Sequence, residues 1–96
     1  MAINQINATV TDVAQALVKN NGKIAKMRVY VVNTGGTHDL FIGSSSVTSS
    51  NGYVLGKFQS TGINNRFQID LFSGDTLFGI CASGQSTTVT ILIPGN

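Results

Sequence analysis

The sequence is poor in ionisable and reactive side chains. Its 96 residues include no glutamate, no tryptophan, one histidine and one cysteine, and 10% are charged, where an ordinary soluble domain carries about 25%. A single cysteine excludes a disulfide scaffold. The net charge of +2 is too small to favour a strongly basic nucleic-acid binder, so no direct nucleic-acid partner is expected. A hydrophobic share of 42% excludes intrinsic disorder, which goes with low hydrophobicity and high net charge.

The few titratable residues are too scattered to form a catalytic or metal site. His38 and Asp39 are neighbours, and on a strand they would face opposite sides. Cys81 lies in the apolar run 77–82, so we expect a core residue rather than a nucleophile. Asp70 and Asp75 are too isolated for a calcium loop, and zinc ligands at close spacing are absent. We therefore predict a protein that is not an enzyme and needs no cofactor or metal.

Long apolar segments are also missing. The longest uninterrupted runs, 29–32 and 91–93, and the run 77–82 that contains Gly79 are all far shorter than the roughly 20 residues of a membrane-spanning helix. Residues 1–7 have neither the basic nor the apolar region of a signal peptide. We expect synthesis in a cytoplasm and no membrane partner.

Alternation of apolar and polar residues dominates what is present. Ile6, Ala8 and Val10 alternate with polar residues, as in strands that bury one face. The same pattern occupies three further segments, 25–31, 66–71 and 88–93. The residues of these segments predicted to face the core are Ala25, Met27, Val29, Val31, Phe67, Ile69, Leu71, Val89, Ile91 and Ile93. The pattern predicts about six to eight short strands with turn signals roughly every eight to twelve residues, which is typical of a sandwich or barrel. The fold class predicted is all-β, a small antiparallel β-sandwich or barrel-like fold.

Glycine-containing segments separate these strands and are predicted to form hairpin turns. They are 33–37, 73–75 and 83–86. The last three strands are accordingly predicted to form an antiparallel meander. Residues 43–62, rich in Ser and Gly, are predicted to be a long loop around short strand pieces.

Residues 12–18 allow two interpretations. Val13, Ala16 and Leu17 have helical spacing, which fits one short helical turn. A continued, bulged strand fits equally well, because the segment is too short to hold a helix without tertiary support. The predicted organisation is an N-terminal strand or arm over 1–11 and a single β-sandwich domain over 12–96.

Four of the six cations fall between residues 19 and 28. They form either a solvated turn and strand face or a docking patch for an acidic protein surface. Nucleic acid is the weaker alternative, because no aromatic residues alternate with the cations to stack on bases.

The predicted surface carries little charge for a soluble monomer. Large apolar residues stand at several outward positions, namely Val32, Phe72, Ile80 and Leu92. Few charges and no internal proline protect the sheet edges. These features predict a chain that works inside a symmetric oligomer or a larger particle.

Several motifs follow one another in a recognisable order. They are Val-Val-Asn-Thr-Gly at 31–35, Leu-Phe-Ile-Gly at 40–43, Val-Thr at 47–48, Asn-Gly-Tyr-Val-Leu at 51–55, Asp-Thr-Leu-Phe-Gly-Ile-Cys-Ala-Ser-Gly at 75–84 and a β run at 89–93. Over roughly residues 28–93 the chain resembles the small β-sandwich proteins of tailed bacteriophage virions. Many of those proteins have Pro-Gly after the leucine of the middle loop, where this chain has Gly56-Lys57-Phe58.

The resemblance implies a structural virion protein on the capsid surface. Its first reading is a capsid decoration (cement) protein that bridges major capsid subunits and forms a homotrimer. A neck, tail or fibre component is the alternative. A third hypothesis, from another class of protein and not implied by the resemblance, is a small carbohydrate-binding or adhesion module with Tyr30 or Tyr53 as a stacking platform. The candidate capsid contacts lie in the N-terminal segment 1–11 and in the basic segment: Ile3, Ile6, Lys19, Lys23, Lys26 and Arg28.

Overall fold

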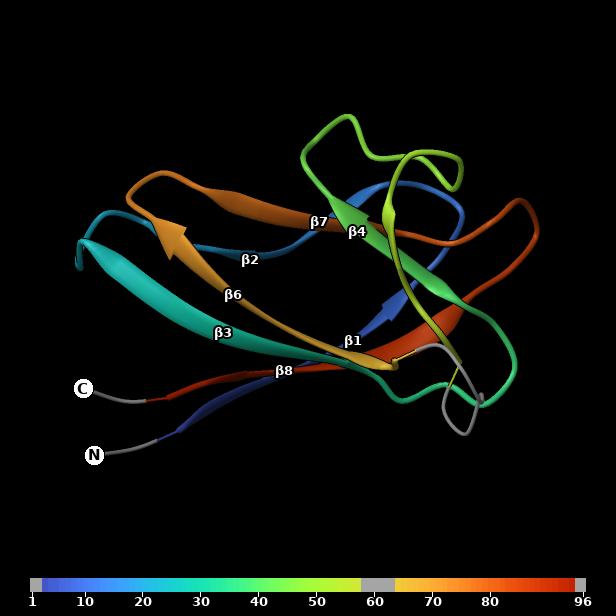
Figure 1. Cartoon of the computed structure of the whole chain (residues 1–96), viewed down its shortest axis with the longest axis horizontal. Helices are drawn as coiled ribbons and strands as arrows, with labels where there is room; N and C mark the ends of the chain where they lie inside the picture. The colour runs from blue at the N-terminus through green and yellow to red at the C-terminus, as the bar shows by residue number, and fades with distance from the viewer. Residues whose placement is uncertain (1–2, 58–63, 95–96) are drawn as a thin grey trace.

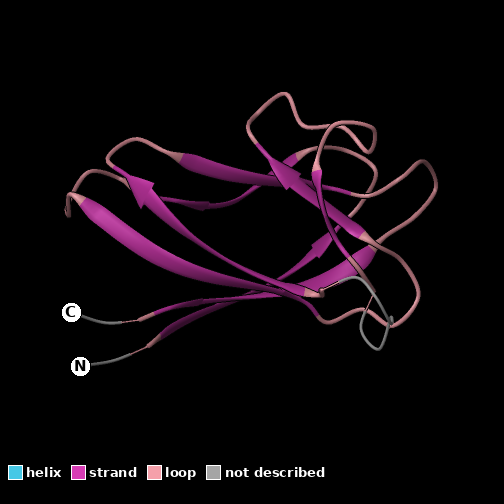
Figure 2. Cartoon of the chain, viewed as in Figure 1, coloured by secondary structure: helices cyan, strands magenta, loops and turns pink. Residues whose placement is uncertain are grey.

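The computed structural model describes residues 3–57 and 64–94, and this part of the chain contains strands and no helix (Figure 2). The eight strands are β1 (Asn4–Val10), β2 (Gln15–Lys19), β3 (Lys26–Asn33), β4 (Leu40–Gly43), β5 (Tyr53–Leu55), β6 (Arg66–Phe72), β7 (Thr76–Ile80) and β8 (Thr87–Ile93). They form two antiparallel four-stranded sheets that face each other (Figure 1). The predicted all-β sandwich is confirmed.

In the ambiguous segment 12–18, residues 15–18 belong to strand β2 and none of the seven residues is helical. Strand β2 pairs with β7 and carries a bulge between Ala16 and Val18. Leu17, inside the bulge, is buried in the core, while Val13 lies exposed before the strand. The helical spacing of Val13, Ala16 and Leu17 does not correspond to a helix. Burial of Leu17 and Val18 between the sheets outweighs the local preference for a helical turn.

The predicted hairpins and meander are wrong. Sheet A has the order β1-β8-β3-β6 and sheet B the order β2-β7-β4-β5, so β6, β7 and β8 do not pair with one another. Each of the three glycine-containing segments instead carries the chain from one sheet to the other. Alternation at period two reports which face of a strand is buried, and it is identical for a strand that turns back and for one that crosses over.

The core lies between the two sheets and uses the predicted inward positions. Val29 and Val31 of β3 are fully buried, and so are Leu40 and Ile91 from β4 and β8. Met27, Phe67, Ile69 and Ile93 pack against this cluster from its rim. Ala25, predicted to face the core, is exposed because β3 begins one residue later.

Cys81 is a core residue, as the sequence predicts. It is 1% exposed, and its thiol donates a hydrogen bond to the carbonyl oxygen of Val10 over 3.4 Å. Burial raises the pKa of the Cys81 thiol above its ordinary value, because the thiolate would be poorly solvated there. The side chain fills space between the sheets as a small hydrophobic group.

A buried asparagine fastens the two sheets at the end where β3 finishes. The amide nitrogen of Asn33 donates to the carbonyl oxygens of Leu55 and Gly56, at 3.1 and 3.2 Å. Its amide oxygen accepts from the Thr87 hydroxyl at 2.7 Å and from the Gly35 N–H at 3.1 Å. Because Asn33 ends a strand of sheet A and Leu55 one of sheet B, the side chain joins the layers. Only glycine fits at 35, since a Cβ there would collide with the Thr87 hydroxyl.

A second buried asparagine does the same at the other end. Asn20 follows β2, and its amide nitrogen donates to the carbonyl oxygen of Leu71 in β6 over 2.8 Å. Its backbone N–H donates to the Asp75 carbonyl oxygen over 2.9 Å. The two asparagines thus connect the sheets at the two ends of the sandwich, and neither lies on the outer face of a sheet.

Candidate functional site

The outer face of sheet B is apolar, and the chain covers part of it with its own loop. Phe41 and Ile80 are register partners on this face, and Val54 and Phe78 point the same way. The loop 44–52 packs here: Val47 is 5% exposed, and a Cβ at Gly52 would lie 2.8 Å from both Val47 Cγ2 and Phe41 Cβ. Val47 therefore serves as a cap over this face.

The outer face of sheet A has no such cap among residues 3–57 and 64–94. Tyr30 of β3 lies opposite Leu92 of β8, and Val32 lies opposite Thr90. These side chains are only half-buried. Tyr30, Val32 and Leu92 line a shallow hollow of about 470 Å³ together with Arg66, Phe67 and Gln68. As far as the described residues go, the centre of this face is thus an open apolar surface, which makes it the candidate functional site.

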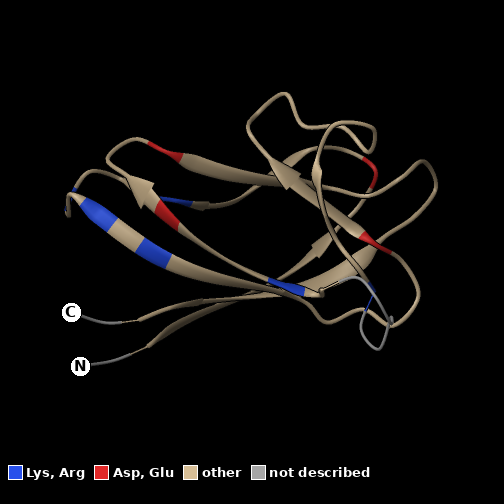
Figure 3. Ribbon diagram, viewed as in Figure 1, with Lys and Arg blue, Asp and Glu red and all other residues tan. Residues whose placement is uncertain are grey.

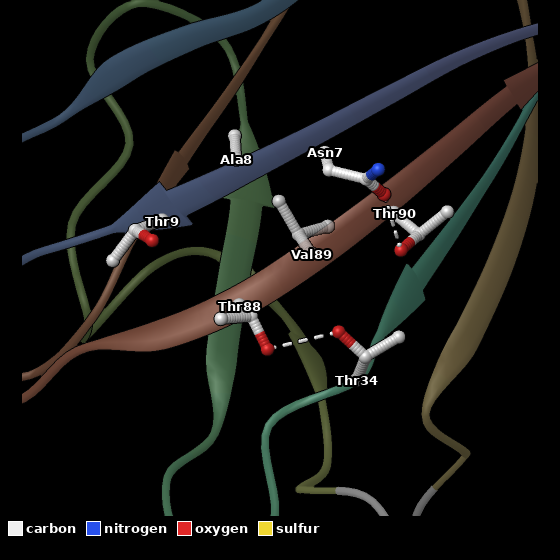
Figure 4. A pocket seen from close by; sticks show the side chains of 7 residues that line it. All are labelled: Asn7, Ala8, Thr9, Thr34, Thr88, Val89 and Thr90. Atoms are coloured by element: carbon white, nitrogen blue, oxygen red, sulfur yellow. Dashed lines mark hydrogen bonds between the residues drawn. The ribbon is translucent and has the colours of Figure 1, made fainter.

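Beside this centre lies a polar but uncharged area on β1 and β8 (Figure 4). The Thr90 hydroxyl donates to the Asn7 amide oxygen over 3.0 Å, and the hydroxyls of Thr34 and Thr88 are 2.9 Å apart. With Ala8, Thr9 and Val89 these residues line a hollow of about 360 Å³. Because the short polar side chains bond to one another, they lose little when water is displaced from them.

The remaining part of the face carries charge. The Arg28 guanidinium donates to the Asp70 carboxylate over 3.1 Å, and the Lys26 ammonium lies 4.0 Å from it. The hydrogen bond to Asp70, followed by its charge, raises the pKa of Arg28 above its ordinary value. Such exposed ion pairs contribute little to stability. Their effect is to give this part of the face, which borders the apolar centre, two positive charges and one negative charge.

The structure gathers the predicted cations at one end of the sandwich, where β2 ends and β3 begins (Figure 3). Lys19 ends β2 and Lys23 lies exposed in the connection. Lys26 and Arg28 stand on the outer face of sheet A. Asp70 lies beside Lys26 and Arg28, so the cluster is less positive than its sequence indicates.

The predicted N-terminal contact residues have different surroundings. Ile3 is 68% exposed, just before β1. Ile6 points inward and packs against the core from the edge of sheet A. Met1 and Ala2, the first residues of the predicted arm 1–11, lie outside the described residues. Residues 4–10 form a full strand of the sheet, paired with β8 over seven residues.

His38 and Asp39 bind different loops. The Nδ1 atom of His38 lies 3.0 Å from the Ser86 carbonyl oxygen, while the Asp39 carboxylate accepts from the Lys57 N–H over 2.9 Å. In the part of the chain that the structure describes, no three His, Cys, Asp or Glu side chains gather as metal ligands would. The two residues fix connections between strands.

The sequence marked Val32 and Leu92 as outward apolar residues but did not bring them together. Tyr30 and Leu92 lie 62 positions apart and meet only through the β3–β8 register, which no local pattern encodes. The threonines of β8 gave a signal, because Thr88 and Thr90 occupy outward positions at period two. Their bonding partners in β1 and after β3 could not be predicted.

Comparison with known proteins gives no relative. No protein-family model, no curated protein and no solved structure matches the chain. Across the described residues, no helix is long and apolar enough to cross a membrane.

Proposed function

We propose that this protein is a structural component of a tailed-bacteriophage particle, where it decorates the head and bridges major capsid subunits. The observation that carries the proposal is the open outer face of sheet A, with Tyr30, Val32 and Leu92 at its centre. An apolar patch with a polar rim is typical of a protein-docking surface. The choice of a tailed-bacteriophage particle rests on the resemblance of residues 28–93 to the small β-sandwich proteins of such virions.

The physical task of such a protein is to hold neighbouring shell subunits together. Contact over the apolar centre removes half-exposed side chains from water, at about 25 cal/mol for each Å² of apolar surface. The uncharged area around Asn7 and Thr90 can be covered without stranding a charge. Many modest contacts from repeated copies then add up through avidity. The proposed oligomer is a homotrimer, and the proposed partner is the major capsid protein.

Copy number distinguishes decoration from the other position in the same particle. Purified particles that contain the protein should hold it at a level comparable to that of the major capsid protein, as measured by quantitative mass spectrometry. A few copies for each particle would instead place it in the neck, tail or fibre.

The basic cluster is proposed to steer the protein onto an acidic shell. Replacing Lys23, Lys26 and Arg28 by alanine should weaken binding to shells, and the wild-type affinity should fall as salt is raised. Lys57→Ala is the matched control, because Lys57 is exposed but lies outside the 19–28 segment. Equal binding by the triple variant and the control would show that the basic cluster does not contribute to shell binding. It would not contradict the decoration function itself.

A second candidate function, carbohydrate binding, is favoured by the position of Tyr30 beside Gln68 in the apolar hollow of sheet A. Tyr53 is less suited to stack on a sugar, because its ring packs against Phe67 with centroids 4.7 Å apart. Binding of glycans by the isolated protein, abolished in Tyr30→Ala, would favour this function over decoration.

A further inference from the structure

The four edge strands differ in how well they resist pairing with another chain. Edge strand β2 is short and interrupted by a bulge, and β5 has three residues. Edge strand β6 carries Arg66 and Asp70. Bulges, short length and charge are the ordinary protections of an exposed edge. The fourth edge, β1, has none of them.

Strand β1 is long, regular and uncharged. It runs over seven residues, Asn4–Val10, without bulge, proline or charge. One side pairs with β8, and β1 ends the strand order of sheet A. In an antiparallel ladder, alternate residues direct their N–H and C=O groups away from the existing partner. Among residues 3–57 and 64–94 no strand pairs with the other side of β1, and that side is therefore ready to accept one.

The inward residues of β1 are also incompletely covered. Ile6 and Ala8 pack against the core but remain partly exposed at the open edge. A further strand alongside β1 would cover them, provided that its own inward residues are apolar. The outward residues Gln5, Asn7 and Thr9 need a neutral polar partner. A second copy of β1 satisfies both conditions.

We propose that β1 pairs with β1 of a second copy, antiparallel, about a two-fold axis at Asn7. This is the register that pairs all seven residues of the strand. Ile6 then lies opposite Ala8 of the other copy, Gln5 lies opposite Thr9, and Asn7 lies opposite itself. Apolar residues meet on the inner side and polar residues on the outer side, so both faces keep their character.

The pairing joins two copies of sheet A into one continuous sheet. Because the axis is perpendicular to the sheet, the two outer faces lie on the same side and form one doubled surface. The contact does not rest on the proposed function. In a trimeric decoration protein it would connect one trimer to the next, since it is used once by each copy.

The test introduces like charges at the axis. Asn7→Lys and Asn7→Asp each place two identical charges opposite one another, and each should weaken dimerisation by about tenfold through Coulomb repulsion. An equimolar mixture of the two variants should restore the dimer, because an ammonium group of one copy then faces a carboxylate of the other. Sedimentation velocity of the full chain over a concentration series gives the association constants.

Two further measurements keep the result interpretable. Gln68→Lys adds a charge to the exposed side of the opposite edge strand, β6, and should leave the dimer unchanged. Circular dichroism melts verify that each variant is folded. If Asn7→Lys does not fold, Asn7→Asp alone serves as the test, since Asp retains an oxygen that can accept from the Thr90 hydroxyl.

A wild-type chain that is monomeric at every concentration overturns the proposal. So does an oligomer that both variants leave intact, or one that the mixture does not restore. The test uses no shell, so it can fail while decoration stands.

Discussion

The two outer faces of the sandwich contain similar residues but have different surroundings. On sheet B, the apolar pair Phe41 and Ile80 lies beside the 44–52 loop, whose Val47 is buried against the sheet. On sheet A, the apolar pair Tyr30 and Leu92 lies on an open surface. An apolar outward residue is therefore a candidate for docking only where the described part of the chain does not cover it.

This difference sharpens the interpretation of the sequence. The sequence alone does not distinguish among four apolar residues at predicted outward positions, namely Val32, Phe72, Ile80 and Leu92. Ile80 belongs to sheet B, the face with the loop, while Val32 and Leu92 lie in the open hollow of sheet A. Phe72, at the end of β6, is 58% exposed. Three of these four residues remain as candidates for contact with a partner.

The largest effect is expected where the two sheets are joined. Asn33→Ala should lower the free energy of unfolding by about 3–5 kcal/mol, because it leaves the buried Leu55 carbonyl oxygen and Thr87 hydroxyl without their partner. Asn21→Ala is the control, since Asn21 is exposed and accepts one bond of 3.4 Å from Lys23. Urea denaturation measures both. Similar losses in the two variants would show that the buried asparagine does not hold the layers together.

The next effect compares the two faces directly by the same deletion. Val47→Ala removes the cap on sheet B and should cost about 2 kcal/mol of unfolding free energy. Val32→Ala on the open face should cost less than about 1 kcal/mol. Equal costs, measured by denaturant unfolding, would mean that the two faces are not different in the isolated protein.

The smallest effect concerns pH and the interior between the faces. The pKa of Cys81 is raised by burial, so above about pH 9 the unfolded chain loses this proton while the folded chain keeps it. Stability should consequently fall with rising pH, by less than about 1.4 kcal/mol for each pH unit. Unfolding measured from about pH 8 to 10 should show a steeper fall in the wild type than in Cys81→Ala. Parallel curves would indicate a thiol that water reaches.

The faces of the strands could be predicted from sequence because burial acts on alternate residues. Val29, Val31, Val89 and Ile91 stand at period two and are all buried. The partner of each strand could not be predicted, since the glycine-containing turns allow both a hairpin and a crossing to the other sheet. The open hollow on sheet A was therefore the hardest feature to predict, because its residues come together only through the strand order β1-β8-β3-β6.

The roles of the asparagines could not be predicted either. Asn33 stands in an Asn-Thr-Gly turn, but the carbonyl groups that it satisfies come from residues 22 and 23 positions later. Asn20 likewise reaches Leu71 across 51 positions. Val47 sits in a segment without periodicity, so its burial left no local signal. The cations were near in sequence, whereas their proximity to Asp70 required the β3–β6 register.

The most direct test of the open face is a charge placed at its centre. Val32→Lys should abolish cosedimentation of the protein with phage shells that lack it, because binding would bury an unpaired ammonium group. Val13→Lys makes the same chemical change at a site that is 67% exposed, outside both sheets, and should bind like the wild type. If Val32→Lys folds and binds as well as Val13→Lys does, the outer face of sheet A is not the docking surface.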